Sequence, residues 1–175
     1  LVRSRGLGDV YKRQSYTIHT DLHTNTAYSS LATQITKIFP IALNTFIIPT
    51  IYGRFIFNDG IPFMYSNVIG GEGYNPHYEQ QIPFSGLPHT ESTLKLLGNA
   101  RIQIRHKFHG KQYLTLSGNY AIHQNQFSNF LQGKKIYGTS IGYGYDSPLG
   151  PIEGFICYSN RTNKLGFYLN IGFGF

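Results

Sequence analysis

The fold is decided by the last eleven residues of the chain, LGFYLNIGFGF at positions 165–175. Every second residue there is large and apolar, whereas the residues between them are small or polar, apart from one Tyr. Because successive side chains of a β-strand point to opposite faces, this alternation predicts a strand with one wholly apolar face. The length also matches the ~9–11 residues that a tilted strand needs to cross a bilayer. The apolar positions are Leu165, Phe167, Leu169, Ile171, Phe173 and Phe175.

Similar alternation recurs upstream and predicts seven strands altogether. Polar or Pro/Gly-rich turns separate them, and short connections alternate with long ones, as is typical of outer-membrane barrels. We expect residues 29–43 to be a loop of moderate length and Pro49 to interrupt one strand. Seven strands cannot close a bacterial barrel, which has an even number of eight or more, so the count indicates a barrel fragment. The six further strands are expected at residues 15–24, 44–57, 93–108, 112–122, 136–145 and 151–159.

The segment 93–108 alternates most tellingly, because one of its faces is apolar and the other carries four cations. In a soluble β-sandwich the charged face would meet water. In a membrane barrel it would line the lumen as a basic stripe. The stripe consists of Lys95, Arg101, Arg105 and Lys107.

Composition narrows the classes of protein further. Only 13% of the residues are charged, about half of the roughly 25% usual in soluble domains. With 41% hydrophobic and 15% aromatic residues, the chain is too apolar to be disordered. Cys157 is the only cysteine, which excludes a disulfide scaffold, and no apolar run approaches the ~20 residues of a transmembrane helix. An outer-membrane barrel or a soluble β-sandwich remains.

Residues 1–14, LVRSRGLGDVYKRQ, differ from the rest because they are basic and show no period. They resemble a translated sequencing adapter, so we expect them to lie outside the fold. Without their net charge of +3, the formal charge falls from +7 to +4. The alternative is a basic arm that binds nucleic acid or anionic lipid. Elsewhere the aromatic residues face away from the cations, so we expect no nucleic-acid partner.

Two motifs carry a resemblance to a known family. The first is GGEGY in the long connection 58–92, which continues as NPHYEQQIPFSG, and the second is GYGYDSPLGPIE at 142–153, followed by the terminal YLNIGFGF. Together they resemble the C-terminal half of the bacterial surface antigen superfamily of outer-membrane barrels. The closer resemblance is to the barrel domain of patatin-like phospholipases from Bacteroidetes-type bacteria. The first motif comprises Gly70, Gly71, Glu72, Gly73 and Tyr74.

The resemblance implies an all-β, antiparallel transmembrane barrel of sixteen strands in the bacterial outer membrane. Residues 15–175 would be the C-terminal part of this barrel, with 58–92 as a long extracellular loop. The implied partners are outer-membrane lipid and the barrel assembly machinery, which would read the terminal apolar strand as an insertion signal. The resemblance also allows a homodimer of the full-length protein.

Glu72 departs from the family pattern, because the superfamily has Arg at this position of the motif. In the family that Arg folds into the lumen and pairs with acidic residues of the wall. Here the wall carries cations instead, so Glu72 is expected to reach Lys95, Arg101 or Arg105 as a charge-swapped lock. The alternative is a solvated loop residue, whose ion pairs contribute little.

The chain itself shows no catalytic motif. G-x-S-x-G does not occur, and the one Asp-Gly pair, Asp59-Gly60, continues with Ile61 rather than the small residue of a patatin-like enzyme. The resemblance therefore implies a non-catalytic anchor or delivery domain of a serine lipid hydrolase, whose catalytic domain lies outside these residues. The alternative is the barrel of a protein assembly or translocation factor. His19, Asp21 and His23 share one strand face but are expected to be polar lumen residues, not a metal site, and no cofactor is expected.

Overall fold

The computed structural model describes residues 10–21, 26–57, 65–72, 80–88, 90–108, 110–148 and 150–172, with side chains from residue 28 onward. Within these residues almost all regular structure is β-strand. No helix there is long and apolar enough to span a membrane. The elements are β1 (Val10–Asp21), β2 (Thr26–Lys37), β3 (Phe39–Ala42), β4 (Thr45–Ile56), β5 (Asn67–Ile69), β6 (Glu91–Thr93), β7 (Leu96–Lys107), β8 (Gln112–Gln124), the 3-10 helix η2 (Phe127–Gln132), β9 (Lys134–Ser147), β10 (Gly150–Ser159) and β11 (Lys164–Ile171).

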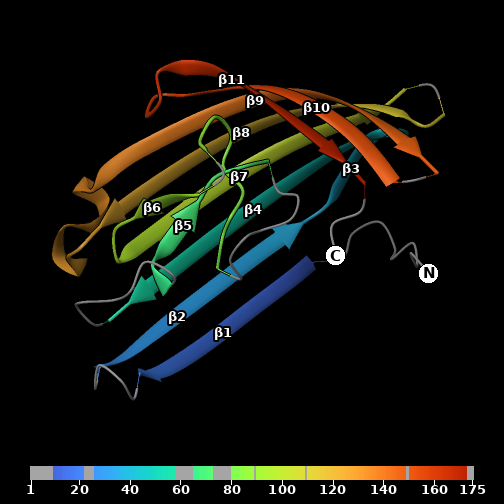
Figure 1. Cartoon of the computed structure of the whole chain (residues 1–175). Helices are drawn as coiled ribbons and strands as arrows, with labels where there is room; N and C mark the ends of the chain where they lie inside the picture. The colour runs from blue at the N-terminus through green and yellow to red at the C-terminus, as the bar shows by residue number, and fades with distance from the viewer. Residues whose placement is uncertain are drawn as a thin grey trace.

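One large antiparallel sheet dominates the structure. Its strands follow the order β1-β2-β4-β7-β8-β9-β10-β11, and β3 pairs with the beginning of β4. The sheet is long and strongly curved, like a section of a barrel wall (Figure 1). Among the described residues β1 and β11 are its two edges, so the curve stays open. The all-β, antiparallel prediction is confirmed.

Residues 29–43 are not the loop that the sequence pattern predicts. They contain most of β2 and all of β3, so the large sheet has nine strands among the described residues and the expected count of seven was too low. The alternation in β2 was weak because only Leu31 and Ile35 are large apolar residues on its outward face, with Thr33 between them. The sheet is open because its two end strands, β1 and β11, do not pair with each other among the described residues, and not because of the number of strands.

Pro49 does not interrupt its strand either. β4 runs unbroken from Thr45 to Ile56, and Pro49 pairs with Ile102 of β7. On the other side of β4, the pairing with β2 ends at Thr50 and the pairing with β3 begins at Ile47. Pro49 lies in this gap of the ladder, where a residue without an N–H is tolerated.

The first strand begins earlier than expected, at Val10 and not at residue 15. Five residues of the segment 1–14 thus pair with β2, from Val10 opposite Lys37 to Gln14 opposite Thr33. The interpretation of residues 1–14 as an adapter artefact stays a prediction. The expected end of this strand at residue 24 falls partly outside the described residues.

The two faces of the sheet have the opposite polarity to those of a water-soluble sandwich. On β8, Leu116 is 50% exposed on the convex face, whereas the polar Thr115 and Ser117 are buried on the concave face. β9 follows the same rule, with Tyr143 exposed and Ser140 buried. An apolar outward face and a polar inward face are the pattern of a barrel wall that contacts lipid.

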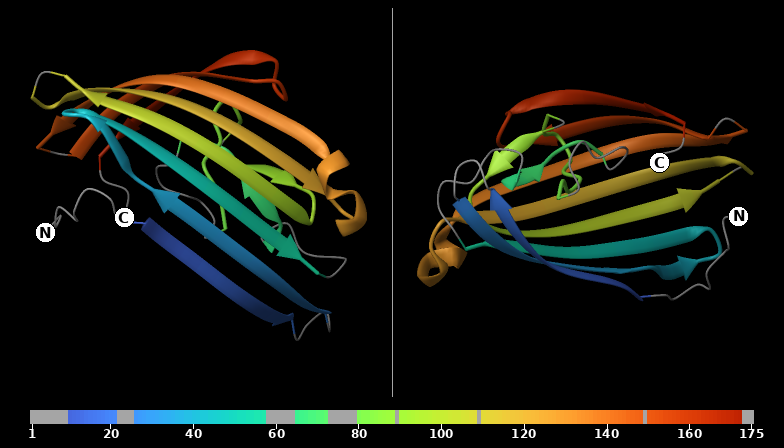
Figure 2. Two further views of the ribbon diagram at one scale, coloured as in Figure 1. Left: turned by 180° about the vertical axis from the view of Figure 1, so that it is seen from behind. Right: turned by 60° about the horizontal axis from the view of Figure 1, so that its bottom comes forward.

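The long connection between β4 and β7 folds back over the concave face. Figure 2 shows β5 and β6 lying within the curve of the sheet. Isolated bridges join Ile69 to Ile82 and Gly71 to Phe84, so residues 65–72 and 80–87 form one unit. This unit, the inserted loop, packs on the wall through a buried apolar cluster. The cluster consists of Tyr52, Ile69, Ile82, Phe84, Leu87, Leu97, Ala121 and Ile136.

Two glycines allow the inserted loop to approach the wall closely. A Cβ on Gly138 of β9 would lie 2.1 Å from the carbonyl oxygen of Ser85. Gly86 adopts φ +80°, and a Cβ there would lie 2.3 Å from the backbone of Tyr158 in β10. Backbone therefore meets backbone at both positions, which only glycine permits without displacement of the loop.

Candidate functional site

The centre of the contact between loop and wall is an ion pair. Glu72 Oε2 lies 3.2 Å from Arg101 Nη2 of β7. The side chains are 1% and 6% exposed, respectively, so the pair is removed from water. Arg101 reaches the loop because the alternation of β7 directs it to the concave face, between the outward Ala100 and Ile102.

Ser85 connects this pair to two further strands of the wall. Its hydroxyl donates to Glu72 Oε2 at 3.2 Å and lies 3.1 Å from the hydroxyl of Ser140 in β9. Asn119 Nδ2 of β8 donates to Ser85 Oγ at 3.2 Å. Both halves of the inserted loop are thus held by polar side chains of three consecutive strands. We call Glu72, Ser85, Arg101, Asn119 and Ser140 the lock cluster.

Burial controls the electrostatics of the lock cluster. Desolvation raises the pKa of the Glu72 carboxyl above its usual value, and it outweighs the opposite effects of Arg101 and of the Ser85 hydrogen bond. Glu72 Oε1 and Arg101 Nε have no hydrogen-bond partner among the described residues. Such a buried pair contributes little net stability by itself, but loss of either partner leaves an uncompensated charge in the interior.

A second buried carboxylate lies on the same concave face. Glu153 of β10 accepts hydrogen bonds from Tyr113 at 2.8 Å and from Arg105 at 3.2 Å. Arg105 also donates to Thr115 at 3.2 Å, and its guanidinium lies 4.6 Å from the ring centre of Tyr113. This group ties β7, β8 and β10 together without contribution from the loop.

The predicted basic stripe is therefore a row of paired cations along much of its length. Arg101 and Arg105 each meet a glutamate, and Lys107 lies 3.9 Å from Asp146 at the end of the strand. Lys95 lies before β7, where its carbonyl oxygen accepts hydrogen bonds from Ile56 and Asn67. The two arginines of the stripe are therefore each paired with a carboxylate.

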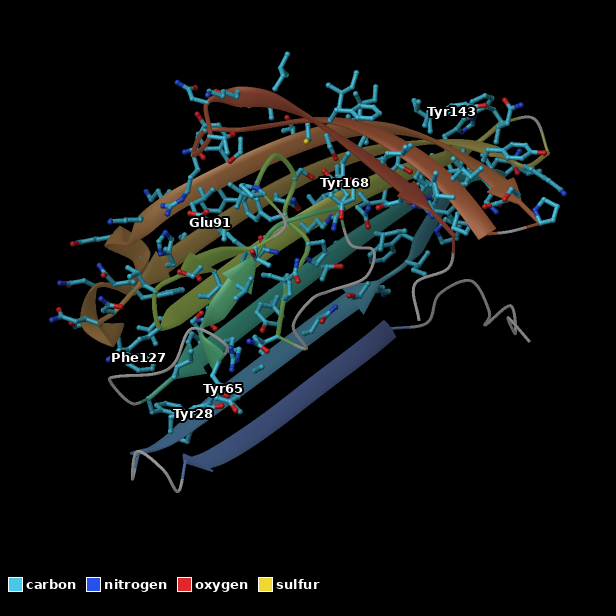
Figure 3. All side chains as sticks on the ribbon, viewed as in Figure 1. Tyr28, Tyr65, Glu91, Phe127, Tyr143 and Tyr168 are labelled. Atoms are coloured by element: carbon cyan, nitrogen blue, oxygen red, sulfur yellow. The ribbon has the colours of Figure 1, made fainter. Side chains whose placement is uncertain are left out.

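Two polar contacts of the loop were not predicted from the sequence. Arg54 of β4 donates to the carbonyl oxygens of Tyr65 and Ser66 and to Asn67 Oδ1, at 3.1–3.2 Å. The sequence offered one sign of this contact, because the alternation of β4 places an Arg on its inward face. At the other side of the loop, Arg161 in the β10–β11 turn binds Glu91 through two nitrogens, at 2.6 and 2.7 Å. A third contact of the loop is aromatic. The ring centres of Tyr65 and of Tyr28 in β2 are 4.8 Å apart, and Figure 3 shows the two side chains next to each other.

The remaining predicted residues do not join this site. Gly70 and Gly71 have positive φ and lead the chain to Glu72, whereas Gly73 and Tyr74 lie outside the described residues. His19 and Asp21 belong to β1, whose side chains are not described, and His23 is also outside. Among the described residues no group of His, Cys, Asp and Glu could hold a metal. In the terminal strand, Leu165, Phe167, Leu169 and Ile171 are exposed on the convex face, and Phe173 and Phe175 lie outside.

A cavity of about 330 Å³ remains between the inserted loop and the wall. Polar side chains of β2, β4 and β7 line it beside the Glu72–Arg101 pair, among them Gln34, Thr50 and Gln103. The cavity contains no nucleophile with an adjacent base among these lining residues.

Comparison with known proteins agrees with this geometry. The sequence model of a family described as the OMP85 superfamily matches residues 3–175, which is nearly the whole chain. The match includes most of the segment 1–14. The search of curated proteins gives no match.

Proposed function

The chain belongs to the OMP85 superfamily, whose domains are outer-membrane β-barrels, and from this premise we propose that it is the non-catalytic membrane anchor and delivery domain of a patatin-like phospholipase. The motifs at 70–74 and 142–153, with their resemblance to Bacteroidetes-type lipases, support the choice of parent. In this proposal the catalytic serine and aspartate belong to another part of the polypeptide.

The observation that supports the anchor part of the proposal is the inserted loop on the concave face. An open conduit would need a clear lumen, whereas here an apolar cluster and the lock cluster hold the loop against the wall. We infer that the Glu72–Arg101 pair is a charge-swapped form of the family's loop contact. In this proposal the apolar outward face anchors the domain in the membrane, and the polar inward face binds the inserted loop.

The experiment is a lipase assay on the complete polypeptide that carries this domain. The protein is extracted from outer membranes with detergent and offered fluorescent phospholipids. We expect hydrolysis of acyl ester bonds by the complete protein and none by residues 15–175 alone. A complete protein without G-x-S-x-G and without ester hydrolysis would contradict the lipase parent, while leaving the family membership intact.

A second candidate is the barrel of a protein assembly or translocation factor, and the superfamily match itself favours it. Such a protein has repeated β-α-α-β modules in the periplasm. Depletion would then lower the amounts of other outer-membrane barrels, which a lipase anchor would leave unchanged. Measurement of folded barrels by heat-modifiability after depletion therefore separates the two functions.

A further inference from the structure

We propose that the cavity between the inserted loop and the wall binds one neutral molecule that carries several hydroxyl groups and has about the size of a monosaccharide. This inference goes beyond the anchor function and does not depend on the lipase parent. It rests on the side chains that face the cavity, on the pairing of its charges and on one buried amide without a partner.

The floor of the cavity is a patch of inward side chains on three neighbouring strands. Tyr52 of β4 lies opposite Gln34 of β2 on one side and opposite Asn99 of β7 on the other. Thr50, the next inward residue of β4, lies opposite Thr36 of β2, and the two hydroxyl oxygens are 3.0 Å apart. All five residues line the cavity. An aromatic side chain is thus flanked by two carboxamides, with two hydroxyl groups beside it.

Further polar groups surround this floor. Glu72 and Gln81 line the cavity from the inserted loop, and Gln103 lines it from β7. Hydroxyl and carboxamide groups both donate and accept hydrogen bonds. A molecule with several hydroxyl groups complements them, because each of its own hydroxyls also donates and accepts. The apolar C–H face of a sugar ring can pack on the aromatic side chain of Tyr52.

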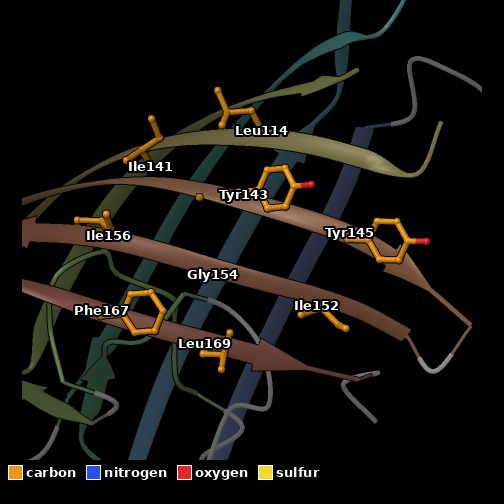
Figure 4. Close-up of a pocket in the computed structure, with 10 residues that line it drawn as sticks. Leu114, Ile141, Tyr143, Tyr145, Ile152, Gly154, Ile156, Phe167 and Leu169 are labelled. Carbon is orange, nitrogen blue, oxygen red and sulfur yellow. The ribbon is translucent and has the colours of Figure 1, made fainter. Parts of the chain in front are cut away.

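Polarity separates this cavity from the hollow on the outward side of the wall. The outward hollow, of about 530 Å³ over Gly154, is lined by apolar and aromatic side chains (Figure 4). The inner cavity, of about 330 Å³, is lined mostly by polar side chains and lies near the lower end of the ~300–1,000 Å³ of ligand pockets. A small polar molecule suits this volume and lining, whereas an apolar one would leave the polar groups without partners.

The charged side chains of the cavity favour a neutral ligand. Two carboxylates and two guanidinium groups line it, and they pair as Glu72 with Arg101 and Glu153 with Arg105, both at 3.2 Å. Their formal charges therefore cancel. An anion or a cation would have to compete with one of these pairs, whereas a hydroxyl group can donate to a carboxylate that keeps its arginine.

Asn99 is the lining residue that points most directly to a ligand. It is only 6% exposed, and its carboxamide oxygen has no hydrogen-bond partner among the described residues. Buried polar groups are normally hydrogen-bonded, because an unsatisfied one destabilises the fold. The alternation of β7 directs Asn99 to the same face as Arg101, toward the cavity. A hydroxyl group bound there would give this carboxamide the partner that the described part of the protein does not provide.

The test offers neutral and charged probes to the full chain, folded in micelles of a zwitterionic detergent that contains no sugar. Saturation-transfer NMR measures contact with D-glucose, D-galactose and myo-inositol, and with acetate and glycine as the charged probes. We expect saturation to pass to at least one neutral probe and to neither charged probe. The bound probe should also raise the urea concentration at the midpoint of unfolding, because it binds the folded chain only.

Three variants locate the binding. Asn99→Leu removes the carboxamide and should weaken binding about tenfold, while the free energy of unfolding without the probe stays equal or rises, since no partner is lost. Gln34→Leu changes the floor on the other side of Tyr52 and should weaken binding as well. Asn170→Leu is the matched control, because Asn170 of β11 also faces inward, is 8% exposed, has an amide nitrogen without a partner among the described residues, and does not line the cavity.

Three results overturn the proposal. If no neutral probe receives saturation, the cavity binds no hydroxylated molecule of this kind. If acetate or glycine displaces the neutral probe, the site selects for charge and not for hydroxyl groups. If Asn170→Leu weakens binding as much as Asn99→Leu does, or if Asn99→Leu and Gln34→Leu both bind like the parent, the probe binds elsewhere on the protein.

Discussion

Glu72 and Arg101 are 29 residues apart in the chain, yet their side chains meet at 3.2 Å in the interior of the curved sheet. The contact joins the inserted loop to the middle of a wall strand. Because both groups are buried, loss of either one would leave the charge of the other uncompensated in the interior. The first three predictions concern the interface at which this pair lies.

Reversal of either charge of the pair should destabilise the barrel, and reversal of both should restore part of the loss. Glu72→Arg or Arg101→Glu alone places two like charges in a buried site and should lower the free energy of unfolding by about 3–5 kcal/mol. The double variant should recover at least half of that loss. Urea unfolding in detergent and heat-modifiability on gels measure the effect. If the single variants fold and unfold like the parent, the lock is wrong.

The ion pair between Glu91 and Arg161 should contribute much less, although its distances are shorter. Its side chains are 28% and 39% exposed, so water and salt screen the charges. A double-mutant cycle with Glu91→Gln and Arg161→Gln should give a coupling energy below about 1 kcal/mol. Added salt should weaken this coupling and leave that of Glu72 and Arg101 nearly unchanged. A coupling as large as that of the buried pair would contradict this, and would show that the β10–β11 turn holds the connection between β4 and β7 as firmly as Arg101 does.

Gly138→Ala should separate the inserted loop from the wall. The new methyl group would lie 2.1 Å from the carbonyl oxygen of Ser85, so the loop must move and the hydrogen bonds of Ser85 are strained. We expect a loss of about 1–3 kcal/mol in the free energy of unfolding. Gly118→Ala is the control, since its methyl group meets nothing within 4 Å and should be neutral or stabilising. Equal effects of the two substitutions would argue against a close contact between loop and wall.

Strands whose outward residues are large were predictable from the sequence. The alternation in β8, β9 and β10 is clear because most outward positions in the middle of these strands are large apolar residues, apart from Gly118, Thr139 and Gly154, and most inward ones are small or polar. β2 lacks this contrast, since Thr33 stands between Leu31 and Ile35, so the pattern of residues 29–43 predicts a loop. Local periodicity also could not show that β4 continues through Pro49, because that depends on where the pairing with β2 and β3 ends.

The site was predictable only where a charge departed from expectation. The inversion at Glu72 pointed to a contact with the cations of β7, and the structure brings Glu72 and Arg101 together. Ser85 and Asn119 carried no such signal, because small polar residues are common in loops and on inward strand faces. Arg54 and Arg161 depend on the path of the loop, which is set by packing between residues distant in the sequence.

The terminal strand supplies the last prediction, that deletion of Phe175 impairs assembly in the outer membrane. The strand presents an outward apolar face, with Phe167 72% exposed and Leu169 and Ile171 beside it. Such a face, ending in an aromatic residue, is the feature that we propose the assembly machinery reads. The amount of heat-modifiable protein in the outer-membrane fraction should fall severalfold, while unfolded chain accumulates or is degraded.

Phe175→Tyr is the conservative control for this deletion, because it keeps a terminal aromatic ring and should assemble like the parent. A defect in binding to the assembly machinery slows insertion in cells but leaves folding into pure lipid vesicles intact. The deletion variant should therefore insert into vesicles at the parent's rate when no assembly factor is present. Normal outer-membrane insertion of the deletion variant in cells would show that Phe175 is no signal. Failure in vesicles as well as in cells would instead assign Phe175 a role in the stability of the strand.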